Sequence, residues 1–114
     1  MNLYGCFALV AGAAGGAGTA AWLSGKVTQQ FERPYERTVT AAREALRALD
    51  LPLSKEVHDD NITQLRSEYT DGREIWVDIK KVTSDATRVD VRVGGVNADK
   101  AAATRILEAI ANRL

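Results

Sequence analysis

All formal charge in this 114-residue chain lies in one part of it. Residues 1–25 contain no Lys, Arg, Asp or Glu, whereas the 15 basic and 15 acidic residues all lie between Lys26 and Arg113. A domain in water needs a charged surface, and an uncharged segment suits a membrane. The sequence therefore predicts two parts: a membrane tether, Gly/Ala-rich and uncharged, over residues 1–25, and a single small domain over residues 26–114.

The tether has the length of a membrane-spanning helix but is diluted by glycine and alanine. As a helix it would extend about 37 Å, more than the roughly 30 Å of a bilayer core. Tyr4 and Trp22 would lie about 27 Å apart, the separation of aromatic residues at two interfaces. Gly12 and Gly16 belong to a four-residue spacing of small residues that lets a second helix approach closely. One alternative is therefore a transmembrane helix, packed within a larger complex.

The other alternative is a lipid anchor on Cys6. The run Leu3-Tyr4-Gly5-Cys6 resembles the lipobox of bacterial lipoproteins, in which the chain is cut before the cysteine and the thiol carries a diacylglycerol. A secretory signal has a basic start and about 7–15 apolar residues. Only five residues precede Cys6, so this alternative expects a start codon further upstream. Cys6 is also the only cysteine, so the domain is expected to be stable without a disulfide.

Residue periodicity predicts an α+β fold for the domain. Ile75, Val77 and Ile79 alternate with polar residues, as in a strand with one buried face, and the segment after Pro34 has apolar residues at helical spacing. The predicted elements are a strand at 26–32, a helix from Pro34 to Asp50, strands at 51–57, 62–69, 74–82 and 87–93, and a helix at 98–113 capped by Asn97. We expect an antiparallel sheet of about five strands, in the order β-α-β-β-β-β-α, with two helices on one face.

The domain shows no recognisable catalytic or metal-binding pattern. His58-Asp59-Asp60 contains the only histidine, but zinc needs three or four converging ligands, and neighbouring side chains in a tight turn diverge. Asp and Asn are also the residues that a turn requires, and no Ser or Cys nucleophile accompanies His58 in a known arrangement. The sequence predicts no enzyme, metal, cofactor or small-molecule substrate. The balanced charge also argues against nucleic acid as a partner.

Trp76 is the candidate contact with a protein partner. It alternates with apolar residues, so its side chain should point to the open face of the sheet. An exposed Trp is a favoured anchor in protein interfaces. The alternative is that Trp76 packs across the sheet against Arg66, Arg88 or Arg92 as a cation–π pair.

Four features of the chain stand together. They are the Gly-Cys followed by the Gly/Ala tract 8–21, the exit 22–26, the helix opened by Pro34, and the ending 89–94 that leads into 106–110. In this combination the chain resembles a family of small proteobacterial envelope lipoproteins known only as a domain of unknown function. The resemblance implies lipidation of Cys6 and an envelope location, with the domain in the periplasm. We expect a non-enzymatic module that docks on another envelope protein. The alternative is an accessory subunit of an integral membrane complex.

Overall fold

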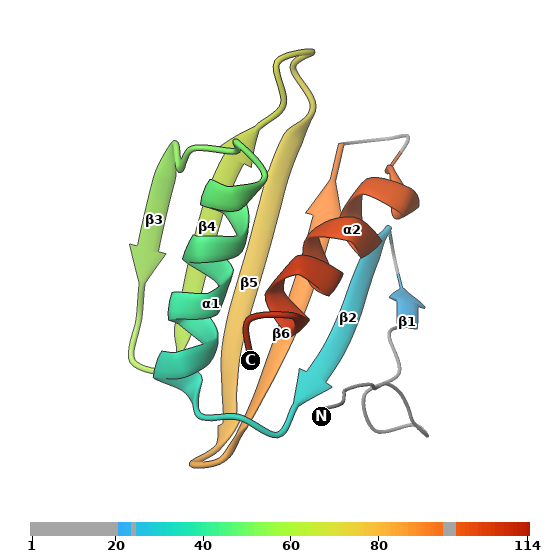
Figure 1. Cartoon of the computed structure of the whole chain (residues 1–114). Coiled ribbons are helices and arrows are strands. Elements are labelled where there is room, and N and C mark those ends of the chain that lie inside the picture. Colours follow the sequence, from blue (N-terminus) through green and yellow to red (C-terminus); the bar gives the residue numbers. More distant parts are fainter. Residues whose placement is uncertain (1–20, 24, 95–97) are drawn as a thin grey trace.

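The computed structural model describes residues 21–23, 25–94 and 98–114, which form one antiparallel sheet with two helices on the same face (Figure 1). The sheet order is β1-β2-β6-β5-β4-β3. The elements are β1 (Ala21–Leu23), β2 (Lys26–Phe31), α1 (Tyr35–Ala48), β3 (Lys55–His58), β4 (Ile62–Glu68), β5 (Glu74–Thr83), β6 (Ala86–Val93) and α2 (Lys100–Ala111). The predicted α+β class and its β-α-β-β-β-β-α order are confirmed, and β1 adds a short sixth strand.

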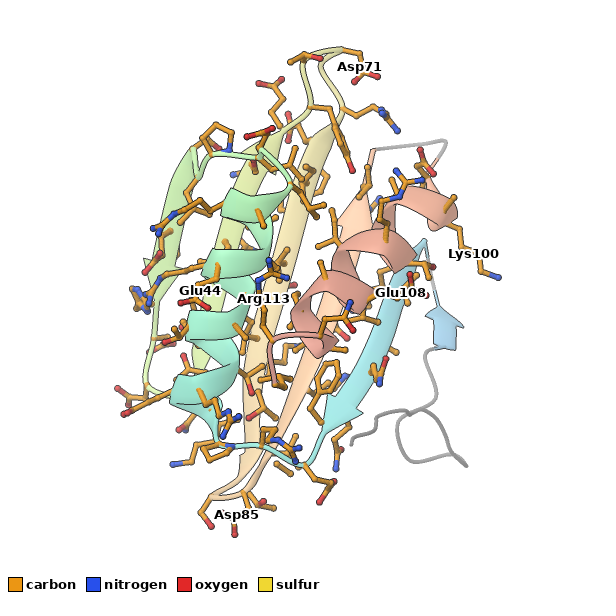
Figure 2. All side chains as sticks on the ribbon, in the orientation of Figure 1. Glu44, Asp71, Asp85, Lys100, Glu108 and Arg113 are labelled. Carbon is orange, nitrogen blue, oxygen red and sulfur yellow. The ribbon has the colours of Figure 1, made fainter. Side chains whose placement is uncertain are left out.

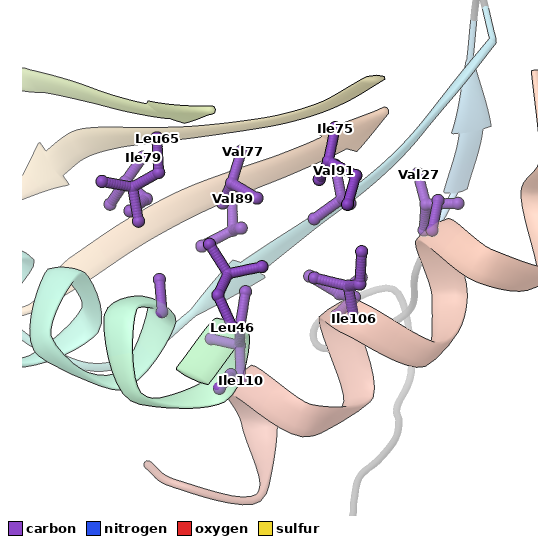
Figure 3. Close-up of a cluster of buried hydrophobic side chains, with 14 of the residues drawn as sticks. Val27, Leu46, Leu65, Ile75, Val77, Ile79, Val89, Val91, Ile106 and Ile110 are labelled. Atoms are coloured by element: carbon purple, nitrogen blue, oxygen red, sulfur yellow. The ribbon is translucent and has the colours of Figure 1, made fainter. Parts of the chain in front are cut away.

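The core lies between the sheet and the helices, as Figure 3 shows. On β5 and β6 every second side chain points into it, so that Val77 and Val91 are fully buried opposite each other. Leu46 on α1 and Ile106 and Ile110 on α2 close the core from the other side. The inward and outward faces that alternation predicted are therefore correct.

The strand order places β2, the first long strand, beside β6, the last strand. Helix α1 carries the chain from β2 to β3 at the far edge, and three successive hairpins return it to β6 beside β2 (Figure 1). The pairing of β2 with β6 places Val27 opposite Val91 and Thr28 opposite Asp90. It closes the sheet between segments about 60 residues apart in the sequence.

Helix α1 ends in a left-handed turn at Asp50, which has φ 60°. The backbone N–H of Leu51 donates to Leu46 O at 2.8 Å and that of Asp50 to Arg47 O at 3.1 Å, the two hydrogen bonds of a Schellman motif. The side chain of Leu51 is buried as part of this helix end. The prediction of a strand at 51–57 is therefore wrong in its first half, and β3 begins at Lys55.

Helix α2 is capped by Asp99, whose side chain accepts a hydrogen bond from the backbone N–H of Ala102 at 3.0 Å. The cap predicted at Asn97 is therefore two residues too early, and Asn97 itself lies outside the described residues. Both residue types cap helices well, so composition alone did not separate them.

Strand β1 lies within the segment that the sequence predicted as tether. It pairs with β2 and places Trp22 opposite Val27, and the turn between them uses Gly25 at φ 80°. Trp22 is therefore in a strand, not in the helix that one alternative expected to run from Tyr4 to Trp22. Cys6, Gly12 and Gly16 lie outside the described residues. In the part of the chain that is described, neither helix has the length and apolar character needed to cross a membrane.

We predict that Val77→Asp destabilises the domain by more than about 3 kcal/mol, because it places an unpaired charge in the core. The matched control is Val82→Asp on the same strand, where the valine is 47% exposed and the loss should stay below about 1 kcal/mol. Urea unfolding followed by circular dichroism measures both. Similar losses for the two variants would show that the two faces of β5 are assigned wrongly.

Candidate functional site

The face of the sheet opposite the helices, here called the open face, carries polar side chains in rows that cross the strands. Residues directly opposite each other in an antiparallel pair share a face. Lys55 pairs with Arg66, Arg66 with Trp76, and Trp76 with Arg92. We call these four residues the Trp76 row. It runs across four strands and contains three cations and one aromatic ring, with Arg66 and Arg92 on the strands on either side of Trp76.

Trp76 is held between two guanidinium groups. Arg66 Cζ lies 5.5 Å from the centre of the ring and Arg92 Cζ lies 5.7 Å from it, both within the range of cation–π attraction. Trp76 is half-buried as a result. The expected outward orientation and the expected cross-strand stacking are both confirmed, for Arg66 and Arg92. Arg88, the third candidate for stacking, instead donates to Asp90 from Nε at 3.2 Å.

A buried carboxylate organises the neighbouring part of the open face. Asp90 is only 2% exposed and accepts a hydrogen bond from the hydroxyl of Thr28 on β2. Three cations surround it, with Lys26 Nζ at 3.6 Å, Lys80 Nζ at 3.9 Å and Arg88 Nε at 3.2 Å from the nearest carboxylate oxygens. Its Oδ2 accepts no hydrogen bond from the described residues, because the two lysine distances are those of ion pairs. These five residues form the Asp90 cluster.

The Asp90 cluster joins side chains of the open face across the pairing of β2 with β6. Lys26 and Thr28 lie on β2, Asp90 and Arg88 on β6, and Lys80 on β5. The carboxylate therefore offsets positive charge contributed by three adjacent strands. Sequence reasoning did not single out Asp90, since the residues that enclose it come from strands whose pairing no local pattern specifies.

We predict that Asp90→Ala lowers the free energy of unfolding by about 1–3 kcal/mol, because the Thr28 hydroxyl loses its acceptor and three cations are left to repel one another. The matched control is Asp78→Ala. Asp78 is directly opposite Asp90, but among the described residues its side chain accepts only the Gln64 amide, at 2.8 Å, so its loss should be smaller. Chemical denaturation at low salt measures both variants, and a larger loss of stability at Asp78 would contradict the stabilising role given to Asp90.

Two exposed apolar residues extend the open face towards the β3 edge. Val57 is 44% exposed and Ile62 is 41% exposed. Val57 pairs with Gln64 and Ile62 with Lys80, both of which belong to the open face. The face therefore combines an aromatic ring, aliphatic side chains and arginines, residue types that recur in the centres of protein interfaces.

His58 lies on the other side of the sheet, where β3 meets α1. Its Nδ1 is 3.0 Å from the hydroxyl of Thr63, which also contacts the hydroxyl of Tyr35, and its Nε2 contacts the carboxylate of Glu56. Arg43 on α1 donates to that carboxylate from Nε at 3.0 Å. The sequence of carboxylate, histidine and hydroxyl has the order of a nucleophilic triad. Thr63 is completely buried, however, so this hydroxyl cannot reach a substrate and the chain of contacts fastens the edge strand to the helix.

The Arg43 guanidinium holds the pKa of Glu56 well below its ordinary value of 4.5, at about 2, and the hydrogen bond from His58 lowers this pKa further against the opposing effect of burial. The hydrogen bond between Arg43 and Glu56 also raises the pKa of Arg43. A carboxyl with a lowered pKa in the folded state stabilises the fold above its unfolded pKa. Its contribution is therefore complete above about pH 4.5 and disappears as the pH falls towards 2.

We predict that Glu56→Gln is less stable than the wild type at neutral pH, and that this difference shrinks between about pH 4.5 and pH 2. Urea midpoints measured across this range test the prediction. Glu44→Gln is the control, because Glu44 is exposed on α1 and has no salt bridge among the described residues. A difference that stays constant or grows on acidification would mean that the Arg43–Glu56 pair does not stabilise the fold.

Within residues 21–23, 25–94 and 98–114, no group of three or more His, Cys, Asp or Glu side chains is placed to hold a metal ion. Around the predicted turn, the carboxylate of Asp59 accepts the backbone N–H of Asp60 at 2.8 Å. Asp59 thus plays the turn-forming role expected for this residue type.

Comparison with known proteins gives a family but no activity. A family model described as "Protein of unknown function (DUF3568)" matches residues 1–113. No curated protein matches the chain.

Proposed function

The chain belongs to the DUF3568 family of proteins of unknown function, and we propose that it is a non-enzymatic, membrane-tethered protein of the bacterial envelope that docks on another envelope protein. The docking surface in this proposal is the open face around Trp76. The anchor is Cys6, carrying lipid, with the domain in the periplasm.

The observation that supports the docking role is the set of residues on the open face. An antiparallel sheet with helices on one side normally turns a polar face to water. Here that face presents Trp76 between two arginines and, further along the strands, Val57 and Ile62, each more than 40% exposed. Trp and Arg are the residues most often found at energetic centres of interfaces.

The strand at residues 21–23 supports a lipid anchor over a membrane-spanning helix. Its pairing with β2 draws Trp22 into the sheet, so Trp22 does not serve as the aromatic residue at the second membrane interface of such a helix. A diacylated cysteine needs no apolar span, since each buried CH₂ contributes about 0.8 kcal/mol to membrane binding. The Gly/Ala tract would then act as a spacer between Cys6 and the sheet.

Photo-crosslinking of the full chain in its native membranes tests the proposal. A photoreactive phenylalanine analogue at Ile62 samples the open face, and the same analogue at Glu44 samples the outer side of α1 (Figure 2). We expect one protein adduct from position 62, weakened by Trp76→Ala, and none of comparable yield from position 44. Equal adducts from both positions, or an adduct indifferent to Trp76→Ala, would sink the docking role.

The same preparation tests the anchor. Cys6→Ser should move the protein to the soluble fraction and remove the adduct from position 62, because the domain would no longer be held at the membrane. A Cys6→Ser protein that stays in the membrane with its adduct intact would contradict the lipid anchor while leaving the docking face in place.

A further inference from the structure

The Trp76 row carries positive charge that the described part of the sheet does not neutralise. Arg66 pairs with Glu74 at 3.1 Å. Among the described residues, no carboxylate lies within salt-bridge distance of Arg92 or Lys55. On one side of the row the carboxylates are already engaged, Asp90 by three cations and Asp78 by an amide. On the other side lie two carboxylates, Glu74, which pairs with Arg66, and Glu68 opposite it on β4. A row of three cations thus keeps an excess of positive charge next to an aromatic ring.

Stacking on Trp76 prepares the two guanidinium groups to bind an anion. A guanidinium that lies over an aromatic ring uses its flat face, so the N–H groups at its edge can still donate to a carboxylate. Arg66 already donates from Nη2 to Glu74 at 3.1 Å, which leaves its other N–H groups for a partner. The ring also limits the rotamers of Arg66 and Arg92, which lowers the entropy lost on binding. Because the arginines lie on β4 and β6, two strand spacings apart, their side chains start about 10 Å from each other.

We infer that the partner of the open face is an acidic protein segment with two carboxylates about 10 Å apart and an apolar side chain between them. The carboxylates would pair with Arg66 and Arg92, and the apolar group would cover Trp76. This inference rests on the proposed docking function and adds the chemistry of the partner.

The charges that border the Trp76 row favour a protein segment over an anionic lipid surface. Glu68 and Glu74 lie directly opposite each other on β4 and β5, next to the Trp76 row, and both are exposed on the open face. A continuous layer of lipid phosphates would have to approach these two carboxylates, at an electrostatic cost. A protein segment can place its carboxylates opposite the arginines alone, so its charge pattern can match that of the face.

A helical peptide gives the required spacing, since residues i and i+7 lie about 10.5 Å apart on one side of a helix. The probe is an Ala/Gln-based helix with Glu at i and i+7 and Leu at i+4, and its control has Gln in place of both Glu. Fluorescence anisotropy of the labelled peptide with the full chain in detergent gives the Kd. We expect Arg92→Gln, or the Gln peptide, to weaken binding at least about tenfold, the loss of one charged hydrogen-bonded pair.

Arg105→Gln on α2 is the matched control, because Arg105 is equally exposed but lies on the helical side, and it should leave the Kd unchanged. Circular dichroism checks that each variant is folded. Arg92→Lys should bind with intermediate affinity, since it keeps the charge and loses the planar stack. Raising NaCl from about 50 to about 300 mM should weaken binding by screening.

Three results would overturn the inference. They are no binding of the Glu peptide, binding indifferent to Arg92→Gln, and binding instead to phosphatidylglycerol vesicles in a manner that depends on Arg92, which would assign the row to lipid phosphates. If the peptide fails while position 62 still cross-links a protein, only the chemistry of the partner is wrong. If cross-linking from position 62 also fails, the docking function itself is wrong.

Discussion

The pairing of β2 with β6 is the interaction on which the rest of the structure depends. It joins the first long strand to the last, so the two helices that lie between and after them are brought to the same side of one sheet. Without it, α2 would lose one of the strands that it covers. The cost of closing so long a stretch of chain is offset by burial, because Val27 and Val91 meet in the core at this seam.

The same seam determines the polar side of the sheet. Thr28 meets Asp90 across it, and the buried carboxylate then gathers Lys26, Lys80 and Arg88 around itself. These three cations form ion pairs with Asp90 within the sheet. In the Trp76 row, two residues further along the strands, Arg66 pairs with Glu74, and Arg92 has no salt bridge among the described residues. The division of the open face into the Asp90 cluster and the Trp76 row is therefore a consequence of strand register.

The two edges of the fold are fixed in different ways. At one edge, β3 is short and exposed. It is held to α1 by a series of side-chain contacts that involves Arg43, Glu56, His58 and Thr63. At the other edge, the three residues of β1 pair antiparallel with β2. In Figure 2 the hairpin tips at Asp71 and Asp85 project from opposite ends of the sheet. Charged edges and short edge strands discourage pairing with further strands.

The sequence determined by itself those features that depend on neighbours along the chain. Alternation of apolar and polar residues fixes which face of a strand is buried, so the inner valines of β5 and β6 and the outward position of Trp76 followed from the sequence alone. Turn residues and helical spacing likewise located the elements. Only the tertiary structure decided which strands lie side by side, because backbone hydrogen bonds between strands carry no sequence code. It thereby decided that Asp90 is buried among cations from three strands, that Arg66 and Arg92 rather than Arg88 hold Trp76, and that residues 21–23 join the sheet.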